Sequence, residues 1–439
     1  MAAALLLTRR GWRVQVWERQ SDALFQERAQ VLQDAGIAVA LGLDLTPEAV
    51  ATAAHRPQTL VVSPGISWQH PALGVARSLG VAVMGEAELA WQFCQGIPWV
   101  GITGTNGKTT TTALLAQMFQ AAGKHAPACG NIGLALCQVV GQMVGDRPDW
   151  LIAELSSYQI ESAPSVAPVV GIWTTFTPDH LNRHGTLEHY RDIKAALLHR
   201  SQHLVLNRDD PFLAAHGARL FPDREILWTG ETSGSAVTID DNWVQAHGEN
   251  ILSLEHWQLV GHHNRQNLLM AVGAAKLCGL AKEAIAQGAA GFRGVPHRLE
   301  PVVRIDGIQF INDSKATNYE AAVVALEAIA QPAIVLAGGQ AKAGDPQPWL
   351  QQLQAKAAAV LLFGEAAPNF AAWLTDHPHA ELQITLEEAV PRALVLARKY
   401  GVNTVLLAPA CASFDAFRNF EERGDRFRQL CLDLAASAA

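Results

Sequence analysis

The sequence predicts an α/β protein built from successive blocks in which strands and helices alternate. Short apolar runs of strand length are followed by segments with helical spacing of apolar residues, which is the pattern of parallel sheets covered by helices. A glycine-rich turn joins one such strand to a helix at residues 101–110. The chain of 439 residues, 49% of them hydrophobic, is long enough for two or three domains.

The first ninety or so residues form the first block. Residues 13–17, 59–62 and 81–84 predict strands, and residues 21–35 predict a helix. The chain opens in a helical pattern over residues 2–8, which Gly11 ends. This alternation favours a parallel sheet.

The second block starts near residue 97 and contains the glycine-rich turn, Gly-Ile-Thr-Gly-Thr-Asn-Gly-Lys-Thr-Thr from residue 101. Glycines let backbone N–H groups curl around phosphate oxygens, and the helix N-terminus adds partial positive charge. Lys108 can reach the β- and γ-phosphates of a nucleotide, and the Thr109 hydroxyl can sit on Mg²⁺. Ile102 stands where the common pattern has glycine, so we interpret this as a variant phosphate-binding loop. A chance glycine-rich turn is the alternative.

Polar residues end two further strands of this block, predicted at 150–153 and 169–173. Glu154 ends the first, and Asp179 and His180 follow the second. Parallel sheets present their ligands at the carboxyl ends of strands, and hard cations prefer oxygen ligands. Glu154 is therefore a candidate metal ligand, with helix capping an equal alternative. His180 is also a candidate metal ligand. The alternative is that it is an ordinary histidine in a surface loop.

The rest of the second block carries weaker signals. Residues 187–200 predict a helix, and Lys194 within it has the pattern of an ordinary solvated lysine. A strand follows at 204–206. Residues 230–260 look irregular, with short strands at best, and 264–280 predict a strong helix.

A third block starts near residue 296 and predicts a doubly wound sheet. Strands at 309–311, 333–336, 360–363 and 405–407 alternate with helical segments. Asp313, Lys342 and Ser413 each follow a strand end, and Arg298 stands at the boundary between blocks. Three such loops of one sheet can converge on a small anionic ligand, although polar strand–helix turns are the alternative.

Composition excludes several classes of function. The formal net charge of −8 argues against a nucleic-acid surface. Six scattered cysteines without a C-x-x-C pair predict reduced thiols in a cytosolic protein. The sequence has no apolar run of membrane-spanning length, and Arg9 and Arg10 follow the apolar start instead of preceding it, which is wrong for a secretory signal. We therefore expect a cytoplasmic protein with no nucleic-acid or membrane partner.

Seven motifs, in order along nearly the whole chain, lie at residues 103–109, 154–159, 179–184, 261–267, 296–300, 312–318 and 409–415. Together they resemble those of the Mur ligases, the ATP-dependent amide-forming enzymes of peptidoglycan precursor synthesis. The phosphate loop is shared with folylpolyglutamate synthases, whereas Asp-Ser-Lys-Ala-Thr-Asn at 313–318 is specific to the D-glutamate-adding member. The sequence has no Asp-Asn-Pro-Arg segment, which the diaminopimelate-adding member would show.

The resemblance implies three domains and one reaction. Residues 1–92 would be a Rossmann-like UDP-sugar-binding domain, 93–296 a central P-loop ATP-binding domain, and 297–439 a doubly wound amino-acid-binding domain. The implied enzyme is a monomer that uses ATP and Mg²⁺ to add D-glutamate to UDP-N-acetylmuramoyl-L-alanine through an acyl phosphate. The alternatives are another Mur-type or folylpolyglutamate-type amide ligase, or a non-catalytic ATP-binding regulator.

The resemblance also implies residue roles. The catalytic residues would be Lys108, His180 and Lys194. The ATP contacts would be Gly104, Thr105, Asn106, Gly107, Lys108, Thr109, Thr110, Asn264, Asn267, Arg298 and Asp313. Mg²⁺ would be held by Thr109, Glu154, His180 and Lys194, a lysine that the family carbamylates into a carboxylate-like group. The UDP-sugar contacts would be Gly65, Asn131 and Gln159, and the D-glutamate contacts Thr317, Lys342, Ser413 and Phe420.

The beginning of the sequence departs from the family pattern. The family opens with a strand and a glycine-rich loop that help to hold the UDP group, whereas this sequence begins at what matches the following helix. A parallel sheet without that strand would leave backbone groups of its neighbours unpaired. Either the true start lies upstream of Met1 or the first domain is damaged, and we favour a truncated or misannotated start. UDP binding is the part of the function that this departure affects.

Overall fold

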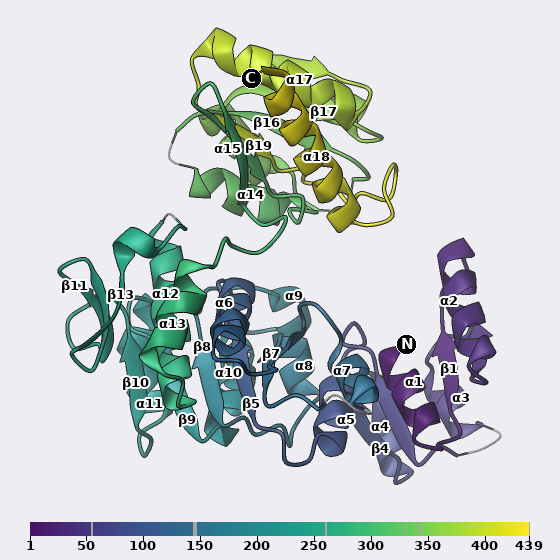
Figure 1. The fold of residues 1–439 in the computed structure, drawn as a ribbon. Coiled ribbons are helices and arrows are strands. Elements are labelled where there is room, and N and C mark those ends of the chain that lie inside the picture. Colours follow the sequence, from purple (N-terminus) through teal and green to yellow (C-terminus); the bar gives the residue numbers. More distant parts are fainter. Residues whose placement is uncertain (54–55, 144–146, 260, 330, 342–343, 439) are drawn as a thin grey trace. The chain divides into compact units, whose positions relative to one another are not determined.

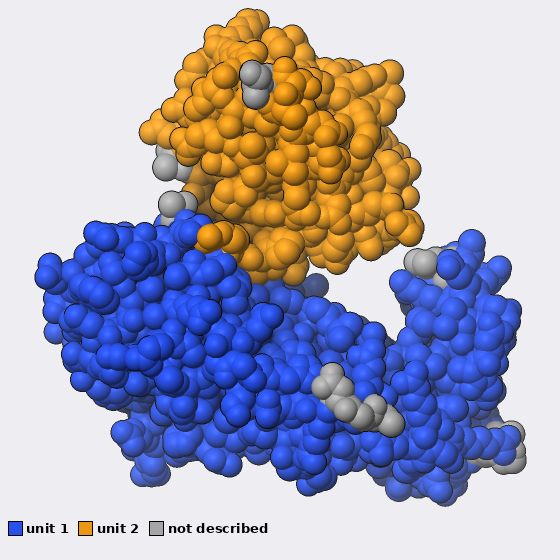
Figure 2. All heavy atoms as spheres, viewed as in Figure 1, with its two compact units in different colours: residues 1–292 blue, residues 293–439 orange. Residues whose placement is uncertain are grey.

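The computed structural model describes residues 1–53, 56–143, 147–259, 261–329, 331–341 and 344–438. The chain forms two compact units, residues 1–292 and 293–439 (Figures 1 and 2). Both units are α/β structures with mainly parallel sheets, which confirms the predicted fold class. The residue boundaries of the three domains stay predictions.

The N-terminal part of the first unit contains two separate pairs of parallel strands. Its elements are α1 (Ala2–Arg9), β1 (Gln15–Glu18), α2 (Ala23–Asp34), β2 (Ala38–Leu41), α3 (Pro47–Ala51), β3 (Thr59–Val62), α4 (Pro71–Ser78), β4 (Ala82–Gly85) and α5 (Glu86–Phe93). β1 pairs with β2 and β3 with β4, and no ladder joins the pairs within the described ranges. Leu6 and Leu7 of α1 are buried in a core with residues of α5 and α7 (Leu136–Gln142).

A nine-stranded sheet follows in the same unit, in the order β13-β12-β11-β10-β9-β8-β5-β7-β6 over its described residues. The strands are β5 (Trp99–Thr103), β6 (Ala128–Gly130), β7 (Leu151–Glu154), β8 (Val170–Trp173), β9 (His203–Asn207), β10 (Ile226–Thr229), β11 (Val237–Asp240), β12 (Trp243–Ala246) and β13 (Glu249–Ser253). The strands from β6 to β11 are parallel, so their carboxyl ends share one edge.

Residues 230–260, for which the sequence predicts irregular structure with short strands at best, contain short strands in the structure. β11, β12 and β13 form an antiparallel extension of the sheet there. Val244 and Ala246 of β12 are buried, whereas Trp243 is exposed. An alternation only four residues long, with a tryptophan on its exposed side, gives a weak strand signal.

Helices surround this sheet and carry several candidate residues. They are α6 (Lys108–Ala121), α8 (Ser157–Glu161), α9 (Leu181–His184), α10 (Leu187–Arg200), α11 (Pro211–Leu220), a short 3₁₀ helix (Leu254–His256), α12 (His262–Leu277) and α13 (Lys282–Ala290). α6 packs against α12 and α13, and α8 packs against α10.

The second unit is a doubly wound sheet, as predicted. Its elements are β14 (Glu300–Ile305), β15 (Ile308–Asn312), α14 (Tyr319–Ala328), β16 (Ala333–Gly338), α15 (Gln347–Lys356), β17 (Ala357–Phe363), α16 (Ala367–Trp373), β18 (Ala380–Leu382), α17 (Leu386–Tyr400), β19 (Thr404–Leu407) and α18 (Phe420–Ala438). The strand order is β14-β15-β19-β16-β17-β18, and only β14 runs antiparallel to its neighbour in the described sheet.

Two hydrophobic cores lie on this sheet. One contains Trp349 and Phe370 from α15 and α16, and the other contains Phe427 from α18 with residues of α17. The six cysteines of the chain are all unpaired, and five are buried. Across the described ranges, no helix combines the length and the apolar composition needed to cross a membrane.

Candidate functional site

The loop between β5 and α6 requires glycine at two positions. Gly104 has a φ of 147° and Gly107 a φ of 83°, both in a region that L side chains rarely adopt. A Cβ at Gly104 would overlap the Thr174 hydroxyl, and one at Gly107 would overlap the Asn267 amide. The backbone therefore passes close to its neighbours, and α6 starts directly after the loop with its first N–H groups at the sheet edge.

The end of β8 holds this loop in place. The Thr174 hydroxyl donates to the carbonyl oxygens of Thr103, at 3.2 Å, and of Asn106. The backbone N–H of Asn106 donates to the Thr175 hydroxyl at 2.9 Å, and that of Thr105 donates to the Thr175 carbonyl at 2.9 Å. These bonds fix the loop backbone from the neighbouring strand.

Two lysines reach the loop from different helices. Lys108 Nζ donates to the carbonyl oxygens of Gly104 and Thr105 at 3.0 and 2.8 Å. Lys194 Nζ, from α10, also donates to the Gly104 carbonyl, at 2.8 Å. Two lysine amines therefore converge on the Gly104 carbonyl of this loop.

Lys194 is buried. The interpretation favoured by its sequence pattern, an ordinary solvated lysine, is therefore wrong. Its residue exposure is 1%, and its Nζ lies 4.4 Å from the centre of the Tyr190 ring. Burial and the charge of Lys108 hold the pKa of Lys194 well below its usual range, against a smaller opposite effect of Asp179. The amine is thereby shifted toward its neutral, nucleophilic form.

Glu154 has one satisfied and one unsatisfied carboxylate oxygen. It ends β7 opposite Ile102 of β5, so it lies at the same sheet edge as the loop. The residue is buried, and its Oε1 accepts from Asn131 Nδ2 at 2.8 Å. Oε2 is buried and has no hydrogen-bond partner in the described structure. A buried oxygen without a partner is costly, and a cation at this atom would remove the cost.

His180 begins the turn into α9 in a left-handed conformation, with φ at 53°. Its backbone N–H donates to Asp179 Oδ1 at 2.8 Å, and its Nε2 lies 3.4 Å from Asp179 Oδ2. The ring packs on Tyr158, with 5.1 Å between ring centres, and half of the side chain is exposed. A partly exposed imidazole near the sheet edge can bind a ligand or a metal.

α12 brings Asn267 to the phosphate loop. The residue is buried, and its Oδ1 accepts from the Thr111 hydroxyl of α6 at 3.3 Å. Asn264 lies three residues earlier on the same helix. The hydroxyl-bearing residues Thr109 and Thr110 are buried at the start of α6.

Three further candidates surround Glu154 and α9. The Asn131 backbone N–H donates to the Glu154 carbonyl at 2.9 Å, in addition to the side-chain bond. Gln159 Oε1 accepts from the backbone and hydroxyl of Ser156 at 3.0 and 3.1 Å, which caps α8. The Gly65 carbonyl accepts from Arg183 Nη1 at 3.5 Å, so α9 contacts the N-terminal part of this unit.

In the second unit, Asp313 follows β15 and is buried. Its Oδ1 accepts from the Leu299 backbone N–H at 3.1 Å, next to Arg298. Burial raises the pKa of Asp313 to about 6. The hydrogen bond from the Leu299 backbone and the positive charges of Arg298 and Lys315 lower this pKa, but by less than burial raises it. His297 and Leu299 have φ values of 61° and 43°, so this contact holds a strained turn.

Arg423 of α18 joins three loops of the second unit. The guanidinium is fully buried and donates to the Ser314 hydroxyl and carbonyl at 3.0 and 2.9 Å. It also donates to the carbonyls of Cys411 at 3.0 Å, Ala412 at 3.2 Å and Gly338 at 3.5 Å. The loops after β15, β16 and β19 therefore meet around one cation.

The predicted D-glutamate residues flank these loops. Thr317 follows Ser314 closely, and Ser413 is buried directly after Ala412. Phe420 starts α18, and its carbonyl accepts from the Ser314 hydroxyl at 2.8 Å. Lys342 lies outside the described residues.

Comparisons with known proteins identify the chain. Residues 102–275 match the Mur ligase middle domain, and residues 297–411 match the Mur ligase glutamate ligase domain. A protein of Synechocystis sp. named UDP-N-acetylmuramoylalanine–D-glutamate ligase is 51% identical over 446 residues, which cover 99% of this chain and 97% of that protein. The chain belongs to the Mur ligase family. A Mur ligase of the same name from Gloeothece citriformis is 49% identical with the same coverage.

Solved Mur ligase structures share the fold. One match is the UDP-N-acetylmuramate-alanine ligase of Thermotoga maritima, with a TM-score of 0.58 at 18% identity. The match covers 99% of this chain and 96% of the ligase chain. A pseudomurein peptide ligase type C from Methanothermus fervidus gives a TM-score of 0.57 at 17% identity, covering 99% and 97%. These likenesses confirm the three-domain α/β fold class, while the residue roles in this Mur ligase stay predictions.

Sequence reasoning missed two residues of this Mur ligase. Arg423 lies among charged residues of α18, so the pattern gives no sign that it is buried. Tyr190 covers Lys194 and its hydroxyl lies 3.3 Å from the Thr105 hydroxyl, a contact between α10 and the loop. Both residues bridge segments far apart in the chain, and one sequence carries no signal for such contacts.

Proposed function

We propose that this Mur ligase uses ATP to add D-glutamate to UDP-N-acetylmuramoyl-L-alanine in peptidoglycan precursor synthesis. The observation that carries the proposal is 51% identity, over 99% of the chain, to a protein named for this activity. The loop geometry supports it, because Gly104, Gly107 and Lys108 form a cradle suited to a triphosphate. We further expect the enzyme to act as a monomer in the cytoplasm.

The residues around the loop fit Mg²⁺ bound to a nucleotide. Glu154 supplies a buried oxygen without a partner, Thr109 supplies a hydroxyl at the start of α6, and His180 supplies an imidazole. When bound, Mg²⁺ would neutralise charge on the transferred phosphoryl group. Gly104, Thr105, Asn106, Thr110, Asn264 and Asn267 would complete the nucleotide contacts, with Arg298 and Asp313 of the second unit.

Lys194 is chemically suited to carbamylation. A neutral amine can attack the carbon of CO₂ and lose a proton, which gives an N-carboxylate with two oxygens. The lowered pKa of Lys194 favours that neutral amine, and the neighbouring Lys108 favours the resulting anion. The modified side chain would then add an oxygen ligand at the loop.

The reaction proceeds in two steps that this arrangement supports. A carboxylate oxygen of the UDP-sugar substrate attacks the γ-phosphorus, ADP leaves, and an acyl phosphate forms. The D-glutamate amine then attacks the acyl carbon, phosphate leaves, and the amine gives up a proton to solvent. Lys108 would stabilise the charge of the first transition state, and Gly65, Asn131 and Gln159 would position the sugar substrate.

The second unit would supply D-glutamate, whose carboxylates need donors. Thr317, Lys342, Ser413 and Phe420 are the proposed contacts, and the buried Arg423 supports their loops. Exclusion of water from the acyl phosphate would protect it from hydrolysis.

The test is phosphate release by the purified full chain with ATP, Mg²⁺ and UDP-N-acetylmuramoyl-L-alanine. We expect release with D-glutamate and no comparable release with L-glutamate, meso-diaminopimelate or no amino acid, and mass spectrometry should find one added glutamate. Lys108→Ala should lower turnover at least about 100-fold, as removal of a transition-state donor does. Lys124→Ala, an exposed lysine beyond α6, is the matched control. Equal rates with another amino acid would defeat the substrate assignment.

A further inference from the structure

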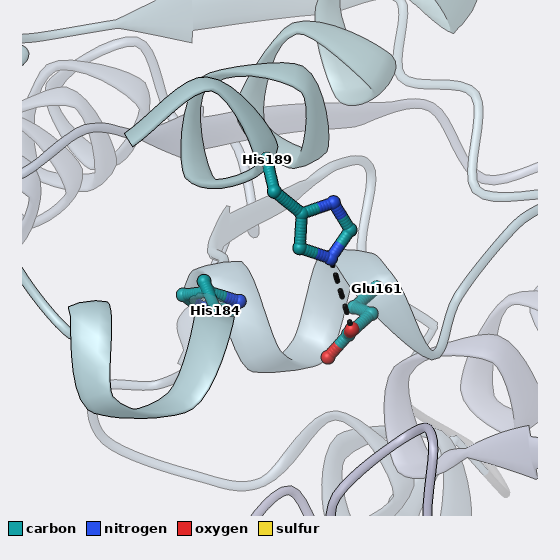
Figure 3. A group of neighbouring side chains, drawn as sticks. All are labelled: Glu161, His184 and His189. Atoms are coloured by element: carbon teal, nitrogen blue, oxygen red, sulfur yellow. Dashed lines mark ion pairs between the residues drawn. The ribbon is translucent and has the colours of Figure 1, made fainter. Parts of the chain in front are cut away.

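Three side chains outside the proposed nucleotide site turn toward one another (Figure 3). They are Glu161 at the end of α8, His184 at the end of α9 and His189 in the first turn of α10. One ligand atom from each lies within 4.8 Å of the other two. We propose that Glu161, His184 and His189 form a binding site for a zinc-class transition metal, distinct from the proposed Mg²⁺ ligands.

The orientation of His184 supports this proposal. The residue is 6% exposed, and its Nε2 lies 2.9 Å from the Ser157 hydroxyl. Its other ring nitrogen, Nδ1, is buried without a hydrogen-bond partner in the part of the chain that the structure describes. Metal-binding histidines commonly use one ring nitrogen as ligand while the other is held by a polar partner.

Glu161 is oriented in a matching way. Its Oε2 lies 3.4 Å from Arg183 Nη2, which leaves Oε1 facing His189 Nε2 at 3.8 Å. That distance is too long for a hydrogen bond, and His189 Nε2 is a second buried ring nitrogen without a partner in the described residues. Two histidine nitrogens and a carboxylate oxygen therefore share one small space, and in the described residues only the ion-pair contact between Glu161 and His189, which requires a protonated imidazole, joins any of them.

The ligand types and spacing favour Zn²⁺ or a similar ion over Mg²⁺. Two imidazoles and one carboxylate are ligands that Zn²⁺ accepts, whereas Mg²⁺ prefers an all-oxygen octahedron. A tetrahedral ion with bonds near 2.0–2.1 Å holds its ligands roughly 3.3 Å apart. The ligand atoms must therefore approach one another by about 1.5 Å at most, and the partly exposed His189 ring can make such a move. Water would complete the coordination.

Occupancy of this site would tie together three helices near the proposed chemistry. α8 contains Gln159, α9 follows His180, and α10 contains Lys194. A metal joining the ends of α8 and α9 to the start of α10 would restrict their relative motion.

The test uses Co²⁺ as a coloured substitute for Zn²⁺. The chelator-treated full chain is titrated with Co²⁺ in a large excess of Mg²⁺, which occupies oxygen-rich sites and competes poorly for imidazole. We expect visible d–d absorption of tetrahedral intensity that saturates at one equivalent and is abolished by one equivalent of Zn²⁺. His189→Ala and Glu161→Gln should each weaken Co²⁺ binding at least about 10-fold, as loss of a ligand or its supporting contacts does.

Two variants separate this site from other sites. His262→Ala removes a different histidine–carboxylate pair, His262 Nδ1 with Glu231 Oε1 at 3.0 Å, and should keep the spectrum. His180→Ala should also keep it. The proposal is overturned if absorption is absent, saturates only beyond one equivalent, survives in both site variants, or is lost equally in either control. Circular dichroism of each variant checks that the fold is retained.

Discussion

Lys108 and Lys194 donate hydrogen bonds to the same backbone oxygen, the carbonyl of Gly104, at 3.0 and 2.8 Å. Two ammonium groups sharing one acceptor repel each other, and the repulsion is strong where solvent is excluded. Lys194 is buried, and burial together with the charge of Lys108 holds the pKa of Lys194 well below the usual range. The phosphate loop is thus bordered by one lysine that can carry charge and one that favours the neutral form.

This asymmetry predicts that activity depends on CO₂. Removing CO₂ from the buffers should lower the turnover of the wild-type enzyme, and added bicarbonate should restore it. Lys194→Met keeps the length of the side chain but has no amine, so turnover should fall at least about 100-fold and no longer respond to bicarbonate. Lys276→Met, which removes a helix lysine paired with Glu249, should behave as wild type. A bicarbonate response in Lys194→Met would contradict carbamylation at this position.

The glycine at the start of α6 should be irreplaceable. In Gly107→Ala, the added methyl group would overlap the Asn267 amide, and the alanine would have to adopt a positive φ. The substitution should therefore abolish ATP-dependent turnover and lower the free energy of unfolding by about 1–3 kcal/mol. Gly123→Ala is the matched control, because Gly123 also has a positive φ, 68°, but open space around its Cβ position. Its cost should be about 1 kcal/mol with turnover unchanged. Phosphate release and thermal unfolding measure both effects, and an active Gly107→Ala enzyme would refute the cradle.

Asp313 should make the stability of the second unit depend on pH. Its pKa rises from 3.8 to about 6 on folding, so between these values the folded state binds more protons than the unfolded state. The free energy of unfolding should therefore fall as the pH rises through this window, by up to roughly 3 kcal/mol, and stay low above it.

Asp313→Asn should remove this dependence. The asparagine carbonyl can still accept from Leu299, and no charge has to be buried, so the variant should be more stable than wild type at neutral pH. Urea unfolding of both proteins between pH 4 and pH 7, followed by a signal from the second unit, measures the difference. Parallel pH profiles of the two proteins would show that Asp313 is not the group responsible.

Arg423 should act on D-glutamate use through the loops that it holds. Arg423→Lys supplies fewer donors in a different geometry, so several buried carbonyls lose their partners, at a cost of about 3 kcal/mol. We expect the KM for D-glutamate to rise more than the KM for ATP. Arg418→Lys changes an exposed arginine paired with Glu422 and is the control. Equal changes in both KM values would indicate a general loss of stability and no specific effect on the loops.

Much of the fold could be predicted from sequence because its signals are local. The buried strands β5, β7, β8 and β16 are short apolar runs, and the helices α10 and α12 are segments of 14 and 16 residues without proline. The phosphate loop was also predictable, since its glycines and Lys108 are adjacent in sequence. β11 to β13 could be predicted only as short strands at best, because strands of four or five residues give too little alternation to place them.

The rest of the site depends on contacts between distant segments. Lys194 looks like a surface residue until Tyr190 and the loop cover it, and the burial of Arg423 arises from loops after three different strands. The partners of Glu154 and His184 likewise come from other elements. Such environments are set by tertiary packing, which the spacing of residues in one sequence does not encode.

Thr174 and Thr175 give the phosphate loop its shape from the neighbouring strand. The conformational entropy of residues 103–106 is therefore lost when the chain folds, and a nucleotide need not supply that cost on arrival. Amide hydrogens of this segment should already exchange slowly in the protein alone. Affinity for the triphosphate then depends on charge and fit, with little contribution from reshaping of the backbone.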